Sequence, residues 1–287
     1  MTHPGPFGYA PLASLASLLV ATLTACQARP PGFGPKPSYV NPPGALADRH
    51  GEEIMVAGVR VHAATPVVLW TDPGGYDAYR VDRRFVPLDQ AGYDAWPTPK
   101  PDPQRYGLRT HGLTSDELEA VRGGGWTLDR LRRVVDQVVI HYDACGTSRR
   151  AFEVLHDERH LSAHFLIDLD GTIYQTLDVQ ERAWHAGVAN DRSVGIELAQ
   201  IGAYPPDEAE VLSRWYAADP GGTTRITIPE ATDRKSLRTP GFVARPRQPD
   251  PITGIVQRRE LMQYDFTPEQ YHALARLLAT LHVALPG

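Results

Sequence analysis

Cysteine is scarce in this 287-residue chain: Cys26 and Cys145 are the only two, too few for a disulfide scaffold. Positive charge is not in excess either, because 29 lysines and arginines stand against 34 aspartates and glutamates. The net charge of −5 gives no electrostatic reason to expect a nucleic-acid partner. Beyond the N-terminus no apolar run approaches the roughly 20 residues that span a bilayer. The remaining composition, 42% hydrophobic and 22% charged, is that of a globular protein with a sizeable core.

The N-terminus carries a pattern typical of export. Residues 12–23 read LASLASLLVATL, which fits the apolar region of a secretory signal. The following Leu23-Thr24-Ala25-Cys26 resembles the lipobox of bacterial lipoproteins, in which the cysteine is lipidated and becomes the first residue. The resemblance implies a signal peptide over 1–25 and a periplasmic protein anchored by lipid on Cys26, in the outer membrane. The alternative is an ordinary secretory signal with a chance cysteine, and the segment before residue 12 lacks lysine and arginine.

Composition divides the rest of the chain. Residues 26–48 are rich in proline and glycine and predict an extended tether. Residues 49–125 form an N-terminal extension whose role the sequence does not give, and residues 126–287 form a second domain. Within that domain, residues 203–264 have little periodicity and predict an insertion that is mostly loop.

Local patterns predict the elements. Thr114 and Thr267 each begin a capping box, which predicts two helix starts. The apolar run 134–142 predicts a buried strand. Further predictions are a hairpin over 53–70 followed by a turn at 72–75, a loop at 97–103, a helix over 148–160, a hairpin over 163–177 with its turn at Asp170-Gly171, and a strand over 193–198.

Histidines are concentrated in the middle of the chain. His156, His160 and His164 are spaced by four, but the residues between them do not match a zincin motif, so we favour a solvated helix face. His141 differs because it lies at the end of a predicted strand, which delivers a side chain rigidly into a cleft. That position suits a metal ligand, although a structural histidine is the commoner case.

Several blocks around His141 carry a resemblance to a known family. In order they are VIHY (139–142), SAHFLID (162–168), DGTIYQ (170–175), AWHAG (183–187), Asn190 and SVGIEL (193–198). This series resembles the zinc-dependent N-acetylmuramoyl-L-alanine amidases of type 2, to which peptidoglycan recognition proteins and phage lysozyme-type amidases are related. The most similar subgroup comprises lipoprotein or cytosolic amidases that act on muropeptides.

The resemblance implies a fold, a reaction and a site. The fold is an α/β one, a mixed central sheet flanked by helices, with Zn²⁺ in a cleft. The reaction is hydrolysis of the amide between N-acetylmuramic acid and L-alanine, in peptidoglycan or muropeptides, by a zinc-activated water. His141 matches the first zinc ligand and Glu197 the glutamate that acts on the water; Ala163, where phage enzymes have tyrosine, fits the glutamate-using branch. The residues implied to contact the substrate are Trp184, His185 and Asn190. We expect the protein to be a monomer.

Two further zinc ligands of the family lie beyond the C-terminal helix, in a block that this sequence does not contain. Three explanations stay open. The chain is part of a longer product; or other residues replace the ligands, with His185, His282 and Cys145 as candidates; or the protein has lost catalysis and only binds peptidoglycan. One histidine cannot hold a catalytic zinc alone.

A cysteine peptidase is a further alternative. Cys145 follows the predicted strand that ends near His141, and it is also near His164 in the sequence. Because Cys145 does not open a helix, no helix dipole lowers the pKa of its thiol. This hypothesis predicts inactivation by thiol alkylation and indifference to chelators, whereas the zinc hypothesis predicts the reverse.

Overall fold

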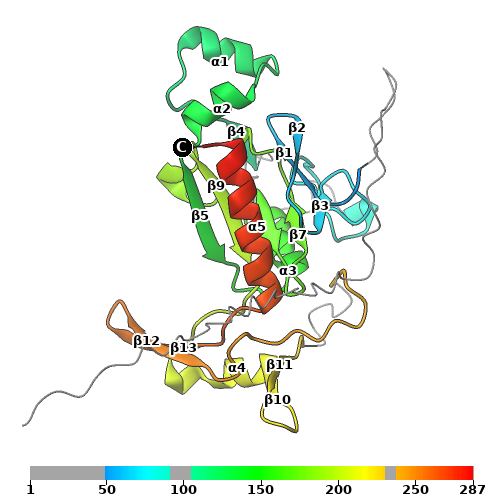
Figure 1. Ribbon diagram of the computed structural model, residues 1–287, viewed down its shortest axis with the longest axis vertical. Coiled ribbons are helices and arrows are strands. Elements are labelled where there is room, and N and C mark those ends of the chain that lie inside the picture. The colour runs from blue at the N-terminus through cyan, green and yellow to red at the C-terminus, as the bar shows by residue number, and fades with distance from the viewer. Residues whose placement is uncertain (1–48, 91–104, 230–236, 287) are drawn as a thin grey trace, which may run out of the picture. The chain divides into compact units, whose positions relative to one another are not determined.

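A five-stranded mixed β-sheet lies at the centre of this computed structural model, with the strand order β3-β7-β6-β9-β5 (Figure 1). Neighbouring strands pair in parallel except β6 and β7, which form an antiparallel hairpin. In sheet order the strands are β3 (Val67–Leu69), β7 (Ile173–Gln175), β6 (Phe165–Ile167), β9 (Ser193–Leu198) and β5 (Gln137–Tyr142). The predicted α/β class with a mixed sheet is confirmed, as is the hairpin that turns at Asp170-Gly171.

The structure describes residues 49–90, 105–229 and 237–286, all of them in one compact unit. The predicted signal peptide, Cys26, the tether and the proline-rich stretch 97–103 lie outside these residues. Within the described part of the chain, no helix is both long and apolar enough to cross a bilayer.

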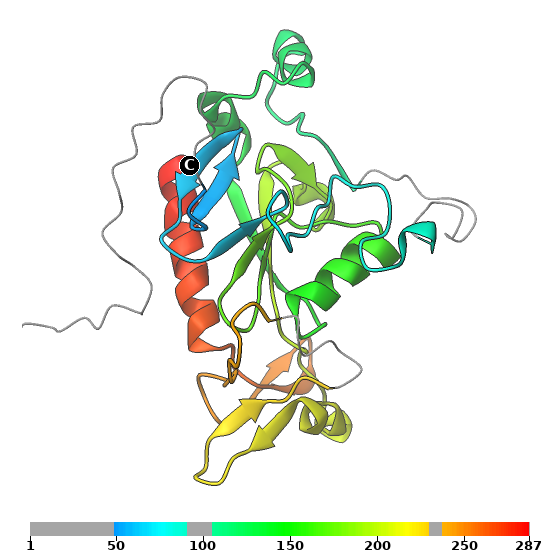
Figure 2. The ribbon, with the colours of Figure 1, turned by 90° about the vertical axis from the view of Figure 1, so that its right-hand side faces the viewer.

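Helices cover the two faces of the sheet, α5 (Pro268–Ala284) on one side and α3 (Ser148–Phe152) on the other (Figure 2). A π-helical stretch, η3 (Glu153–Glu158), continues α3, so the predicted helix over 148–160 is confirmed apart from its last residues. Alternate residues of each strand face alternate helices. In β9, Val194, Ile196 and Leu198 pack in the α5-side core, and the residues between them face α3.

Helix α5 is fixed at its N-terminus by the predicted capping box. The Thr267 hydroxyl accepts a hydrogen bond from the Gln270 backbone, and the Gln270 side chain accepts one from the Thr267 backbone. The Thr267 hydroxyl also donates to the carbonyl of Leu169, 2.8 Å away, which ties the helix start to the β6–β7 turn. Leu277 and Leu281 are buried against the sheet.

Residues 49–125 are built into the same unit as the sheet. The hairpin β1 (Glu53–Val56) and β2 (Val59–His62) packs on the α5-side core, and the next strand is β3 of the sheet itself. β4 (Tyr106–Leu108) pairs with β8 (Glu181–Ala183), directly before Trp184 and His185. The remaining elements of this stretch are the 3₁₀ turn η1 (Leu88–Gln90) and α1 (Ser115–Arg122), and α2 (Leu128–Val134) follows it. The predicted extension therefore completes the sheet and supports the segment 181–185.

Residues 203–264 hold more regular structure than the sequence indicates. Their elements are the 3₁₀ turn η5 (Pro206–Glu208), α4 (Glu210–Trp215), β10 (Tyr216–Ala218), β11 (Thr224–Ile226), β12 (Ile252–Val256) and β13 (Arg259–Gln263). Trp215, Tyr216 and Ile228 form a small core with Leu169 and Ala199 of the main fold. Elements of three to six residues show too few repeats for a period to be visible, and their core draws on residues far apart in sequence.

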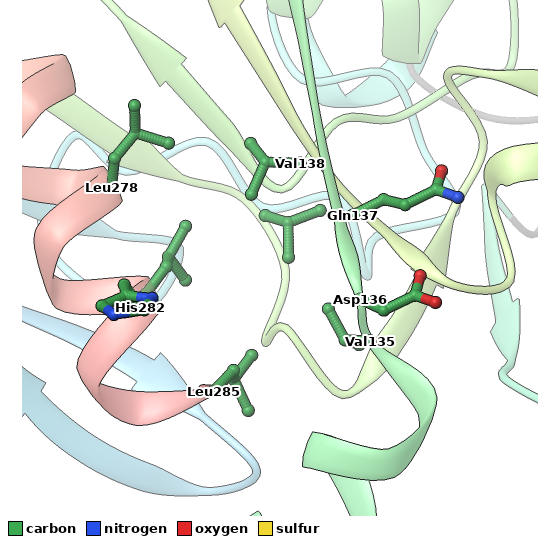
Figure 3. A pocket seen from close by; sticks show the side chains of 9 residues that line it. Val135, Asp136, Gln137, Val138, Leu278, His282 and Leu285 are labelled. Carbon is green, nitrogen blue, oxygen red and sulfur yellow. The ribbon is translucent and has the colours of Figure 1, made fainter. Parts of the chain in front are cut away.

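The predicted buried strand over 134–142 is only partly correct. Val134 ends helix α2, and β5 lies at the edge of the sheet, where Val138, Ile140 and Tyr142 are 41–48% exposed. Helix α5 reaches only the start of this strand, so an apolar groove lies between them (Figure 3).

Candidate active site

Two parallel strands bring the predicted zinc ligand and the predicted acid–base residue together. In the β5–β9 register His141 is paired with Glu197, so both side chains leave the α3 face of the sheet at neighbouring positions. Two predictions are confirmed: one strand ends near His141, and residues 193–198 form another strand. Strand pairing thus creates a contact between residues 56 positions apart.

His141 and Glu197 open into a cavity of about 530 Å³ between the sheet edge and the α3–η3 helix. His185 and Cys145 also line it, and so does Arg159, which follows η3. The cavity is lined in addition by apolar helix residues and strand neighbours: Ile140, Ala151, Val154, Leu155 and Leu161. Of the five residues predicted for catalysis, metal binding or substrate contact, the cavity brings together His141, His185 and Glu197.

Glu197 has the properties of an acid–base group. Only 8% of the residue is exposed, and burial raises the pKa of its carboxyl to about 7. The positive charge of Arg159 opposes this shift in part. A carboxyl with a pKa near neutrality can take a proton and return it at the pH of most cells.

The two histidines of the cavity touch each other. His141 Nε2 lies 3.2 Å from His185 Nδ1, and His185 Nε2 lies 3.2 Å from the Ser193 hydroxyl. Burial lowers the pKa of both, that of His185 to about 4, so both imidazoles are neutral at neutral pH. Gly195 leaves room for this pair, because a Cβ at that position would lie 2.6 Å from the His185 ring.

Asn190 and Trp184 do not line the cavity, in contrast to their predicted contact with substrate. The Asn190 side-chain oxygen accepts hydrogen bonds from the backbones of His185 and Ala186, which fixes the turn η4 (Gly187–Ala189). The Trp184 indole nitrogen lies near Gly107 of β4, and the Trp184 backbone donates to the Ser162 hydroxyl. Both residues therefore hold the loop that carries His185.

Sequence reasoning missed Arg109, which is fully buried beneath this loop. Its guanidinium donates to the carbonyls of Val179, Asn190, Asp191 and Ser193, at both ends of the loop. A guanidinium presents five donors in one plane and is suited to gather carbonyls in this way. Nothing in the local sequence marks Arg109, because its partners lie 70 to 84 residues away.

The prediction of a solvated histidine face is wrong. His164 is fully buried and His156 is 1% exposed. His164 Nδ1 accepts from the Gly195 backbone while its Nε2–H donates to the Glu181 carbonyl. His156 stacks on Phe152 and bonds Asp157. The helix ends before residue 160, so the spacing by four does not continue onto one face.

The described residues do not complete a metal site. A catalytic zinc takes three protein ligands, and no group of three histidine, cysteine, aspartate or glutamate side chains suited to a metal occurs among residues 49–90, 105–229 and 237–286. His141 and His185 provide two nitrogens at the edge of one cavity. His282, a predicted replacement, lies in the groove between α5 and the start of β5 (Figure 3).

Cys145 lines the cavity but is not an activated thiol. Burial, reinforced by the nearby carboxylate of Asp143, raises the pKa of Cys145 to about 12. The thiolate that a cysteine peptidase requires is therefore disfavoured.

Comparison with known proteins shows similarity to amidases. Residues 131–220 match the family described as N-acetylmuramoyl-L-alanine amidase. This stretch holds His141, His185 and Glu197. The 1,6-anhydro-N-acetylmuramyl-L-alanine amidase AmpD of Haemophilus influenzae is 31% identical over 122 residues, which cover 40% of this chain and 60% of AmpD. The amidase family is thus supported for the central part of the chain, which spans about 60% of this curated relative.

Two solved structures are also similar. One is the complex of the N-acetylmuramyl-L-alanine amidase AmiD from E. coli with anhydro-N-acetylmuramic acid-L-Ala-D-gamma-Glu-L-Lys, with 20% identity, a TM-score of 0.32, and coverage of 53% of this chain and 44% of AmiD. The other is a selenomethionine AmpD derivative, with 24% identity, a TM-score of 0.21, and coverage of 38% and 65%. TM-scores this low do not allow the geometry of those structures to be applied to this chain. The site is therefore described from the residues of this chain alone.

Proposed function

We propose that this protein hydrolyses the amide bond between N-acetylmuramic acid and L-alanine in peptidoglycan or muropeptides. The observation that carries the proposal is the pairing of His141 with Glu197 at the edge of a cavity, where burial brings the pKa of the Glu197 carboxyl to about 7. The amidase match over residues 131–220 supports the choice of bond.

The chemistry assigned to this chain is proton transfer. The Glu197 carboxylate takes a proton from the attacking water and returns it to the nitrogen of the leaving L-alanine. Neutral His141 and His185 offer ring nitrogens at the same cavity to orient water or the carbonyl. Apolar side chains of the α3–η3 helix restrict water on the opposite wall.

Zinc dependence and the cellular compartment in which the protein acts remain predictions. The resemblance implies zinc, and among the described residues His141 and His185 offer two of the three nitrogens or oxygens required. The deciding measurement is the zinc content of the purified chain against that of His141→Ala. Export and lipid attachment at Cys26 rest on residues 12–26, outside the described part of the chain.

The test is turnover of a defined muropeptide by the soluble chain that starts after Cys26. We expect mass spectrometry to detect a free peptide beginning with L-alanine, and Glu197→Gln to reduce its rate by about 10² to 10⁴. Glu208→Gln, at an exposed glutamate of η5, is the matched control and should keep full activity.

Activity of the wild-type chain should rise with pH through about 7, as Glu197 loses its proton. Equal turnover in Glu197→Gln and wild type would refute the assignment. Retention on cell wall without any released peptide, by the wild-type chain, would instead favour a binding module. Loss of activity on thiol alkylation would favour Cys145.

A further inference from the structure

The hairpin of β12 and β13 projects from the rest of the protein (Figure 1). Residues 252–260 are all exposed, although an isolated two-stranded hairpin is only marginally stable in water. The hairpin is attached at its other end, where Met262 exchanges two backbone hydrogen bonds with Tyr204 and packs in the small core around Trp215. An element that is fixed at its base and exposed along the rest of its length is suited to contact a partner.

One face of the hairpin is apolar and open to solvent. Paired residues of antiparallel strands share a face, so Ile252, Val256 and Leu261 lie on the face opposite Met262. Ile252 is 46% exposed and Val256 56%, and Ile255, on the other face near the tip, is 79% exposed. Aliphatic side chains gathered on one short element gain free energy when a partner removes them from water, and they mark an interaction site.

The turn at the tip brings two arginines next to these side chains. Gln257 and Arg258 connect the strands with φ values of 49° and 67°, in the left-handed region that a two-residue type I′ turn requires. Arg258 therefore lies at the end of the hairpin, and Arg259 lies beside its pairing partner Val256. Both arginines are exposed. The tip thus combines cationic and aliphatic side chains within a few residues.

Carboxylates near the tip do not pair with these arginines. Glu260, the one acidic residue of the hairpin, lies on the opposite face from Arg259. Asp207 and Glu208 belong to η5, which contacts β13. Within the described part of the chain, none of these three carboxylates forms an ion pair with Arg258 or Arg259. The charge of the tip is therefore available to an anionic partner.

We propose that the tip of the β12–β13 hairpin docks on a membrane surface that contains anionic phospholipids. At such a surface aliphatic side chains enter the boundary between headgroups and acyl chains, while arginines approach the lipid phosphates. A glycan partner fits less well, because residues 252–261 contain no aromatic ring to stack on a sugar. Symmetric contact between two copies would place arginines of like charge together. The inference does not depend on the proposed amidase reaction, because binding to lipid involves no hydrolysis.

Co-sedimentation with lipid vesicles tests the proposal. The soluble chain that starts after Cys26 is used, so that lipid on that cysteine contributes nothing. We expect saturable binding to vesicles of phosphatidylcholine and phosphatidylglycerol in equal parts, and little binding to phosphatidylcholine alone. Binding should weaken as salt is added, because salt screens the attraction between guanidinium and phosphate groups. Equal binding to the two kinds of vesicle, or binding to neither, would overturn the proposal.

Variants of the hairpin separate the contributions of charge and apolar contact. Arg258→Gln and Arg259→Gln should each weaken binding to the mixed vesicles about fivefold, the effect of one basic residue near an anionic surface. Val256→Asn should weaken it about tenfold, through loss of one buried aliphatic side chain. Two matched controls should change nothing: Arg122→Gln in α1, where the side chain is 67% exposed, and Val243→Asn, where the residue is 56% exposed as Val256 is.

A fluorescent label reports whether the tip itself enters the lipid. In a Cys145→Ser background, an environment-sensitive dye attached to Val256→Cys should shift its emission to shorter wavelength when mixed vesicles are added. The same dye on Val243→Cys should not shift. Unshifted emission from the hairpin label, or equal binding by the hairpin variants and their controls, would overturn the proposal. A hairpin variant that loses retention on isolated cell wall but binds vesicles normally would also overturn it, since that result identifies peptidoglycan as the partner.

Discussion

At the scale of single residues, the candidate site depends on what surrounds each side chain. Burial places the pKa of Glu197 near 7 and keeps His141 and His185 neutral. Gly195 contributes by having no side chain, since the His185 ring occupies the space of its Cβ. The site therefore requires glycine at position 195 as specifically as it requires the carboxyl group of Glu197.

Gly195→Ala tests this requirement. A Cβ 2.6 Å from the His185 ring forces the ring to move, so we expect turnover to fall at least tenfold and stability to fall by about 1–3 kcal/mol. Thermal unfolding and muropeptide turnover measure the two effects. Gly254→Ala in β12, where no atom lies within 4 Å of the new Cβ, is the control. Normal turnover in Gly195→Ala would show that the His185 position is not needed.

Asp168 makes the stability of the protein depend on pH. Burial raises the pKa of its carboxyl from the ordinary value of 3.8 to about 8. Between these values the unfolded chain has released the proton that the folded chain still holds, so stability falls as pH rises from about 4 to about 8. We expect urea unfolding of Asp168→Asn to show a shallower fall over this range. An unchanged slope would contradict the protonated state of Asp168.

At the scale of elements, caps and pairing decide which predictions hold. The two capping boxes begin helices where the sequence places them, because the cap and the first turn are local. The two caps differ in surroundings: Thr267 is fully buried and also bonds the Leu169 carbonyl, whereas Thr114 is exposed.

Replacing each cap by alanine should therefore give different losses. Thr267→Ala removes a cap and leaves a buried carbonyl without its donor, so we expect a loss of about 2–3 kcal/mol. Thr114→Ala removes only the exposed cap and should cost about 1 kcal/mol or less. Urea unfolding of both variants gives the comparison, and equal losses would show that the contact with Leu169 contributes little.

At the scale of the whole molecule, residues 49–125 and the region that matches the amidase family belong to one compact unit. The earlier segment supplies the edge strand β3, the partner strand of β8, and the buried Arg109 that gathers the His185 loop. The region that carries the family motifs thus depends on a segment that contains no block of the family resemblance.

A chain that starts at residue 126 should for this reason fail to fold cooperatively. The apolar surface left open beneath β1, β2 and β3 and the carbonyls left by Arg109 both oppose folding. A chain that starts at residue 49 is the control and should unfold in a single transition. Circular dichroism during thermal unfolding distinguishes the two, and cooperative unfolding of the shorter chain would contradict the single unit.

The sequence by itself determined the features that depend on near neighbours or on a long series of motifs. These are the two caps, the β6–β7 hairpin, the β9 strand, and the nomination of His141 and Glu197. Only the tertiary structure decided the edge position of β5 and the burial of His156 and His164. It also decided that Asn190 and Arg109 hydrogen-bond the loop that carries His185. The physical reason is range: strand order, burial and the partners of a guanidinium depend on residues tens of positions away. The composition of a short segment does not show which distant residues will contact it.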